Sequence, residues 1–167
     1  PYTTLFRSFR ASINSPKKSK EKTASALYSD IRKQGERAYR ARNYSLARHQ
    51  YIKGAQLLAN TFADSDNRLC FLYSSAGNAA RCQGQTKFTL FLKDFNNAIT
   101  HLDASQSGFV ELLNYIVDAL FDTAVWINTS NQRAQVTKMA NRLQRRFRAH
   151  GQVAQGLVAE GLQGLLA

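Results

Sequence analysis

Apolar residues recur at helical spacing through most of this 167-residue sequence. The clearest run spans residues 110–127, where apolar side chains return every three or four positions, the repeat of one helix face. Alternating Val, Ile and Thr patterns and hairpin dipeptides are absent, so the sequence predicts an all-α fold. Comparable helical runs occupy residues 24–41, 44–58, 69–84, 88–102 and 136–147.

The composition narrows the class of protein further. Hydrophobic residues make up 44% of the chain, which argues against an intrinsically disordered protein. No stretch of eighteen consecutive apolar residues occurs, so the sequence predicts no transmembrane helix. Two cysteines are too few for a disulfide framework. We therefore expect a soluble, basic, cytoplasmic protein.

The beginning of the chain carries two unusual segments. Residues 1–8 resemble the in-frame translation of a common short-read sequencing adapter, and we interpret them as an artefact. The only methionine is Met139, so we expect a fragment whose natural sequence begins near Phe9. Any targeting signal or upstream domain would then be missing from this sequence. Residues 9–23 contain a lysine-rich run and predict a basic linker or tail. The helical domain is then predicted over residues 24–167.

The excess positive charge is concentrated at the two ends. The chain has 23 Lys and Arg against 11 Asp and Glu, a formal net charge of +12. Residues 9–58 carry 12 basic and 3 acidic side chains, and residues 133–167 carry 6 and 1. Between them, residues 59–132 carry 4 basic and 7 acidic side chains. This distribution does not favour a uniform nucleic-acid-binding surface.

Short polar breaks predict how the helices connect. Asn43 lies in the first break, where it suits a left-handed turn that makes the two flanking helices antiparallel. Asp66 and Ser130 are predicted helix caps. The tail 152–167 has leucines near helical spacing and three glycines, and we expect it to form a terminal packing helix.

Small and aromatic residues repeat in these helical pairs. In the first pair the set is Gly35, Tyr39, Tyr44, Ala47 and Tyr51. This pattern resembles the tetratricopeptide repeat, and the segment 72–99 resembles it less closely. The resemblance implies an α-solenoid of about three helical pairs with a concave groove. The spacing between the two segments exceeds the usual period, and another helical bundle, such as a microtubule-interacting-and-transport-type three-helix bundle, is the alternative.

The resemblance also implies a function and a site. Members of the family act as adaptors, and the groove would bind a partner peptide. Because guanidinium groups grip carboxylates, we expect an acidic partner. Glu36 and Ser75 stand where co-chaperone members have asparagine, so we do not expect binding of a chaperone tail. The predicted peptide-binding residues are Arg32, Tyr39, Arg40, Asn78 and Arg81.

A second reading starts from the basic ends. A nucleic-acid-associated helical protein would use them to neutralise phosphates. A solvated helix face is the simpler interpretation of the same residues. The predicted polyanion-binding residues are Lys17, Lys18, Lys20, Arg142, Arg145, Arg146 and Arg148.

No pattern points to an enzyme. Three histidines are scattered along the chain, and the sequence predicts no metal site and no cofactor. Asp118 and Asp122 are one helical turn apart, and without a partner histidine we read them as a solvated stripe. Cys70 and Cys82 lie on one predicted helix and are too far apart to form a disulfide. We expect both thiols to be buried where this helix packs on its neighbours.

Overall fold

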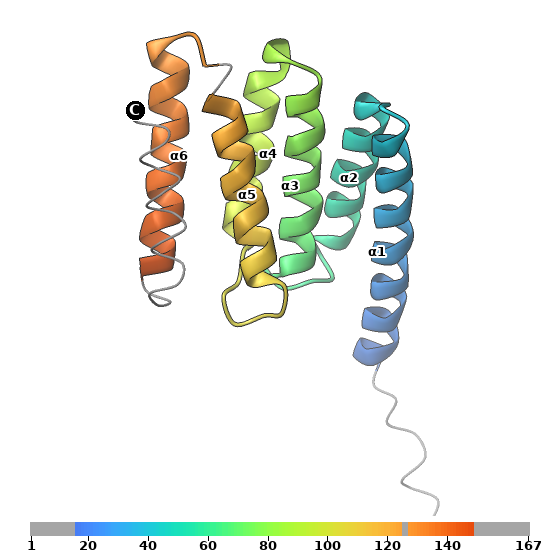
Figure 1. The fold of residues 1–167 in the computed structure, drawn as a ribbon. Helices are drawn as coiled ribbons and strands as arrows, with labels where there is room; N and C mark the ends of the chain where they lie inside the picture. Colours follow the sequence, from blue (N-terminus) through green and yellow to red (C-terminus); the bar gives the residue numbers. More distant parts are fainter. Residues whose placement is uncertain (1–15, 125–126, 149–167) are drawn as a thin grey trace, which may run out of the picture.

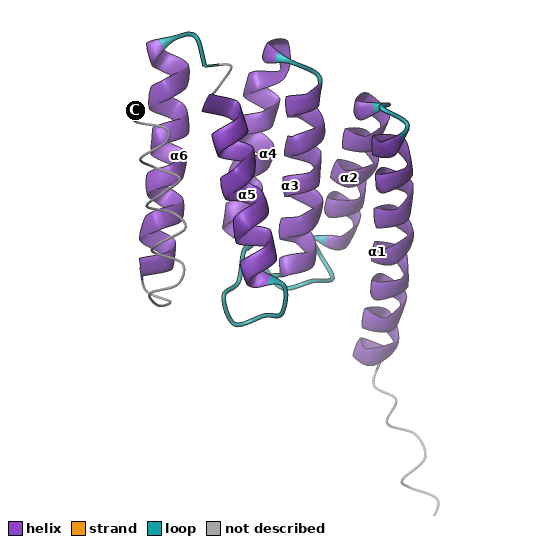
Figure 2. Cartoon of the chain, viewed as in Figure 1, coloured by secondary structure: helices purple, strands orange, loops and turns teal. Residues whose placement is uncertain are grey.

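The computed structural model describes residues 16–124 and 127–148, and that part of the chain is helical between its loops (Figure 2). This confirms the all-α prediction. Residues 1–8 and the predicted terminal helix at 152–167 lie outside the described residues. The elements are α1 (Pro16–Arg40), α2 (Tyr44–Leu58), α3 (Asn67–Cys82), the 3-10 turn η1 (Gln85–Lys87), α4 (Phe88–His101), α5 (Phe109–Ala124) and α6 (Ser130–Arg148).

The helices stack in adjacent pairs (Figure 1). Helix α1 packs on α2, α3 on α4, and α5 on α6. Helix α3 is the centre of the stack, because it also contacts α1, α2 and α5. The first helices of the three pairs, α1, α3 and α5, thus lie in one layer, with α2 and α4 behind it in Figure 1. The fold is a repeat-like stack, as the sequence predicted.

Two hydrophobic clusters meet in α3. One joins α1 and α2 to α3, and the other joins α3 to α4, α5 and α6. Two glycines allow the helices within a pair to approach. A Cβ atom at Gly35 would overlap the ring of Tyr51, and one at Gly77 would overlap the ring of Phe95. The small residue expected at Gly35 is therefore required by a buried aromatic ring of the partner helix.

Helix α1 is longer than the sequence predicted. It begins at Pro16 rather than near residue 24, so residues 16–23 of the expected linker are helical. Proline suits the first helical turn, where its missing N–H has no partner to lose and its fixed φ is already helical. The lysine-rich composition hid this start signal.

The helix ends use local side-chain and backbone contacts. Asp66 caps α3 as predicted, accepting a hydrogen bond from the Arg68 backbone N–H at 2.8 Å. Asn43 caps α2, and the left-handed residue of that turn is Arg42 (φ 57°), not Asn43 as expected. At α6 the side chain of Thr129, and not the expected Ser130, accepts from the Gln132 backbone at 3.2 Å. In both places the residue that makes the turn or the cap precedes the predicted one by one position.

None of the described helices is long and apolar enough to cross a membrane.

Candidate functional site: a groove along α1, α3 and α5

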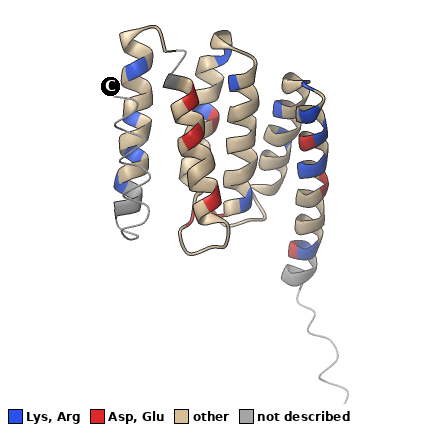
Figure 3. Cartoon of the chain, viewed as in Figure 1, with Lys and Arg blue, Asp and Glu red and all other residues tan. Residues whose placement is uncertain are grey.

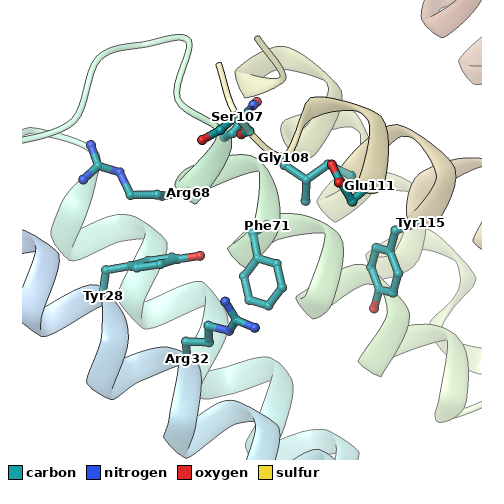
Figure 4. Close-up of a pocket in the computed structure, with 10 residues that line it drawn as sticks. Tyr28, Arg32, Arg68, Phe71, Ser107, Gly108, Glu111 and Tyr115 are labelled. Carbon is teal, nitrogen blue, oxygen red and sulfur yellow. Dashed lines mark hydrogen bonds between the residues drawn. The ribbon is translucent and has the colours of Figure 1, made fainter. Parts of the chain in front are cut away.

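A groove of about 420 Å³ runs between the layer helices α1, α3 and α5 (Figure 4). One side is formed by α1, the floor by α3, and the other side by α5 with the loop before it. The lining residues are Tyr28, Arg32, Asn67, Arg68, Phe71, Ser107, Gly108, Glu111, Leu112 and Tyr115. Its volume lies in the range of about 300–1,000 Å³ that ligand sites occupy.

Phe71 forms the aromatic floor of the groove. The rings of Tyr28 and Tyr51 stand edge-on to it, with centroids 6.3 and 6.4 Å away. The guanidinium carbon of Arg32 lies 4.8 Å from the centroid of the Phe71 ring. In Figure 4, Arg32 and Tyr28 extend from α1 toward Phe71. The floor therefore offers an apolar face bordered by a cation and a phenol.

A second hollow of about 180 Å³ continues the groove toward the C-terminal end of α1. The two hollows share Phe71 and Tyr115, so they adjoin along the same helices, and we call them together the groove. The remaining residues that line the second hollow are Glu36, Tyr39, Arg40, Tyr51 and Ser75.

Tyrosine hydroxyls around the groove remain protonated over a wide pH range. Burial raises the pKa of Tyr28, Tyr39 and Tyr51 above the usual tyrosine value. Burial also raises the pKa of Tyr115, although Asn78 and Ser75 hydrogen-bond to its hydroxyl and act in the opposite direction. These phenols are therefore neutral hydrogen-bond donors and acceptors at neutral pH.

Most cations at the groove already have an acidic partner. Arg32 Nε donates to Glu36 at 2.7 Å on the same helix. Arg68 forms an ion pair with Asp66 at 2.8 Å, and its guanidinium covers the ring of Phe62 at 3.6 Å. Exposed helical pairs like the first contribute only about 0.3–0.5 kcal/mol, so a ligand can compete for Arg32.

Asn67 holds the loop that closes one end of the groove. Its side-chain amide donates to the backbone carbonyls of Asp103 and Ser107 at 3.0 and 3.2 Å. Its side-chain carbonyl accepts from the Asp103 backbone N–H at 2.8 Å, and its own backbone N–H donates to Gln106 Oε1 at 3.0 Å. One buried side chain thus fixes residues 103–107 against the start of α3, next to Gly108 and Glu111.

The predicted peptide-binding residues fall into two groups. Arg32, Tyr39 and Arg40 line the groove. Asn78 and Arg81 instead belong to a hydrogen-bonded chain between helices. Asn78 donates to the Tyr39 hydroxyl at 3.0 Å and accepts from Arg81 Nε at 2.9 Å. The structure brings the first three together at the groove and assigns Asn78 and Arg81 a role in joining α1, α3 and α5.

Arg81 completes this chain on α5. Its Nη1 atom pairs with Asp122 at 2.9 Å. Asp118 and Asp122 are both exposed, as expected for a solvated stripe, and Asp122 in addition joins α5 to α3. Cys82 also contributes, since its sulfur lies 3.1 Å from the Tyr39 hydroxyl, while Cys70 is fully buried as expected. The described residues include no group of three His, Cys, Asp or Glu side chains able to hold a metal ion.

The predicted polyanion-binding residues are spread over two distant helices. Lys20 is exposed on α1, and Arg145 is exposed on α6. Arg142 is engaged by α4, where it donates to Asn96 Oδ1 at 3.1 Å and Thr100 Oγ1 at 2.8 Å. The side chains of four further residues lie outside the described part of the structure: Lys17, Lys18, Arg146 and Arg148.

Sequence reasoning missed several groove residues. Tyr28 precedes Arg32 by one helical turn, and Phe71 precedes Ser75 by one turn, so extending each groove-facing stripe would have found both. Tyr115 and Glu111 come from the third pair, which lacks the repeat motif. No local signal identified them, because their place depends on how α5 packs on α3.

No protein-family model, curated protein or solved structure matches this chain.

Proposed function

We propose that this protein is a non-catalytic, tetratricopeptide-like adaptor that binds a peptide segment of a partner protein in the groove along α1, α3 and α5. The observation that supports the proposal is the pair of adjoining hollows, of about 420 and 180 Å³, that share Phe71 and Tyr115. A groove of this kind can accept a chain that passes from one hollow to the next.

The chemistry of the lining suits a peptide. Aromatic rings provide apolar contact area that costs little side-chain entropy, and tyrosine hydroxyls can pair with peptide amides. Arg32 and Arg40 line the groove and can pair with carboxylates of the partner, so we propose that the partner segment is acidic.

A peptide selection tests this proposal. Random-sequence peptides displayed on phage are selected on the purified protein, and the affinities of the recovered peptides are measured by fluorescence anisotropy. Phe71→Leu keeps an apolar side chain but removes the aromatic floor, and we expect it to weaken binding about tenfold. Lys53→Ala, an exposed change on α2, is the control and should leave affinity unchanged. Selected peptides that bind Phe71→Leu as tightly as the wild type would contradict groove binding.

The second candidate function is nucleic-acid association through α6. That helix has six basic and no acidic residues. One face of α6 has a shallow hollow of about 450 Å³, and the polar residues that line it are Ser130, Arg133, Thr137, Lys138, Asn141 and Arg145. Cations beside hydroxyl and amide groups can contact a phosphate backbone.

Salt dependence tests this second candidate. Binding to single-stranded homopolymer RNA should weaken steeply as salt rises, because phosphate neutralisation releases counterions. The triple variant Arg133→Gln, Lys138→Gln and Arg145→Gln should make the log–log slope shallower by about 2, at about 0.7 per lost phosphate contact. A shallow slope in the wild-type protein would rule against this candidate.

A further inference from the structure

We propose that the groove selects a peptide segment that carries both signs of charge, with acidic side chains toward α1 and basic side chains toward α5. This inference rests on the proposed peptide-binding function and adds the chemistry of the ligand. It also replaces the simpler expectation of an acidic partner with a stricter requirement.

The α1 side of the groove is predominantly cationic. Helix α1 has eight basic and three acidic residues. Two of its arginines, Arg32 and Arg40, line the hollows, with Glu36 as the one acidic neighbour on that side. Glu36 is engaged by Arg32, so Arg40 keeps the excess positive charge at the C-terminal end of α1.

The α5 side is anionic. Helix α5 contains Glu111, Asp118 and Asp122 and no lysine or arginine, and the three acidic residues are exposed. Relative to Glu111, the positions of Tyr115, Asp118 and Asp122 are four, seven and eleven residues further on, which places all four on one helix face. Glu111 and Tyr115 line the groove, so this acidic stripe borders it. Figure 3 shows acidic positions along α5 and mostly basic positions along α1.

The floor between these two sides is close to neutral. Arg68 is paired with Asp66, and Arg81 is paired with Asp122, so the two arginines of α3 are both neutralised. The surface between them is formed by Phe71 and Ser75. The charges that a ligand meets therefore come from the two flanking helices.

This separation of charge excludes the simpler ligands. A wholly acidic segment would gain at Arg40 but place like charges against Glu111 and Asp118. A wholly basic segment would face the opposite conflict at Arg40. Juxtaposed like charges suppress the wrong partner, whereas complementary charges fix orientation and register. A segment with acidic and basic residues on opposite edges satisfies both sides.

Charge-reversal pairs test the inference with peptides from the phage selection. We expect the selected sequences to contain at least one acidic and one basic position. Arg40→Glu should weaken binding about tenfold, and a peptide with its acidic residue changed to lysine should restore it. Glu111→Lys should also weaken binding about tenfold. Only a peptide whose basic residue is changed to an acidic one should restore binding to this variant. Lys53→Glu on α2 and Asp30→Lys on α1, both exposed and outside the groove lining, are the matched controls.

The outcomes separate this inference from the proposed function. If binding depends on Phe71 but neither reversal changes it, the charge requirement is wrong and peptide binding stands. If both reversals are rescued by the same peptide position, the assignment of one sign to each helix is wrong. If Phe71→Leu has no effect on any selected peptide, the groove is not the binding site and both proposals fail.

Discussion

At the scale of single residues, the fold depends on a few positions where the helices touch closely. Gly35 faces the ring of Tyr51, and Gly77 faces the ring of Phe95, so the first two pairs each have a glycine on one helix against an aromatic side chain on the other. Gly35 and Ala47 are the small residues of the repeat pattern identified in the sequence, and both are buried. It could not predict that Asn78 and Arg81 would be used between helices, because their partners lie on α1 and α5.

Gly35→Ala tests this close packing. The added methyl group would overlap the Tyr51 ring, and forcing extra volume into a packed interface costs about 1–3 kcal/mol of unfolding free energy. Urea denaturation measures the change. The exposed neighbour Gln34→Ala should stay within about 0.5 kcal/mol of the wild type. Equal stability of the two variants would show that the helices in this pair are not held at that distance.

Asp94 is expected to make the stability of the fold depend on pH in a defined direction. It is 1% exposed on α4 and pairs with Arg48 of α2 at 2.8 Å. Burial outweighs the ion pair and raises the pKa of Asp94 above the ordinary carboxyl value. The Asp94 carboxyl then binds a proton more tightly in the folded chain than in the unfolded chain. Its contribution to the unfolding free energy therefore falls as pH rises through the raised pKa.

The variant Asp94→Asn isolates that contribution. The unfolding free energy of the wild type minus that of the variant should decrease as pH rises from the ordinary Asp value, about 3.9, toward neutrality. Denaturation at a series of pH values measures it. A difference that grows with pH would mean that the charged pair with Arg48 outweighs burial.

At the scale of helices and loops, the periodicity of apolar residues predicted six helices in the described part of the chain, with ends mostly within a few residues of the observed ones. The seventh predicted helix, at 152–167, lies outside the described residues. The largest error was at α1, where the lysine-rich composition concealed the eight helical residues 16–23. The groove was predicted only in part, since Tyr115 and Glu111 depend on the placement of α5. That placement depends in turn on Asn67, whose contacts lie 36 to 40 residues further along the chain.

Asn67→Ala should loosen this end of the groove. The change leaves the carbonyl groups of Asp103 and Ser107 without their amide donor, and we expect a loss of about 2 kcal/mol in unfolding free energy. Hydrogen exchange should also accelerate at the Asp103 amide, which donates to Asn67 in the wild type. Asn60→Ala, at an exposed position, is the control. Unchanged exchange at Asp103 would contradict the anchoring role of Asn67.

At the scale of the whole molecule, the chain is a stack in which each helix is stabilised mainly by its contacts with neighbouring helices. Helix α3 contacts α1, α2, α4 and α5, whereas α6 packs mainly on α4 and α5. We expect backbone amides of α3 to exchange most slowly and those near Lys20 in α1 to exchange fastest among the helical residues. Hydrogen–deuterium exchange with mass spectrometry measures this gradient. Uniform protection over α1 to α6 would indicate one cooperative bundle instead of a stack.

The central claim is that the groove along α1, α3 and α5 receives a partner peptide. Nuclear magnetic resonance tests it most directly, by adding a phage-selected peptide to the isotope-labelled protein and mapping the amide shifts. We predict changes centred on Arg32, Phe71 and Tyr115, with no change at Lys53 on α2. Shifts confined to α6, or to the outer sides of α2 and α4, would contradict the claim.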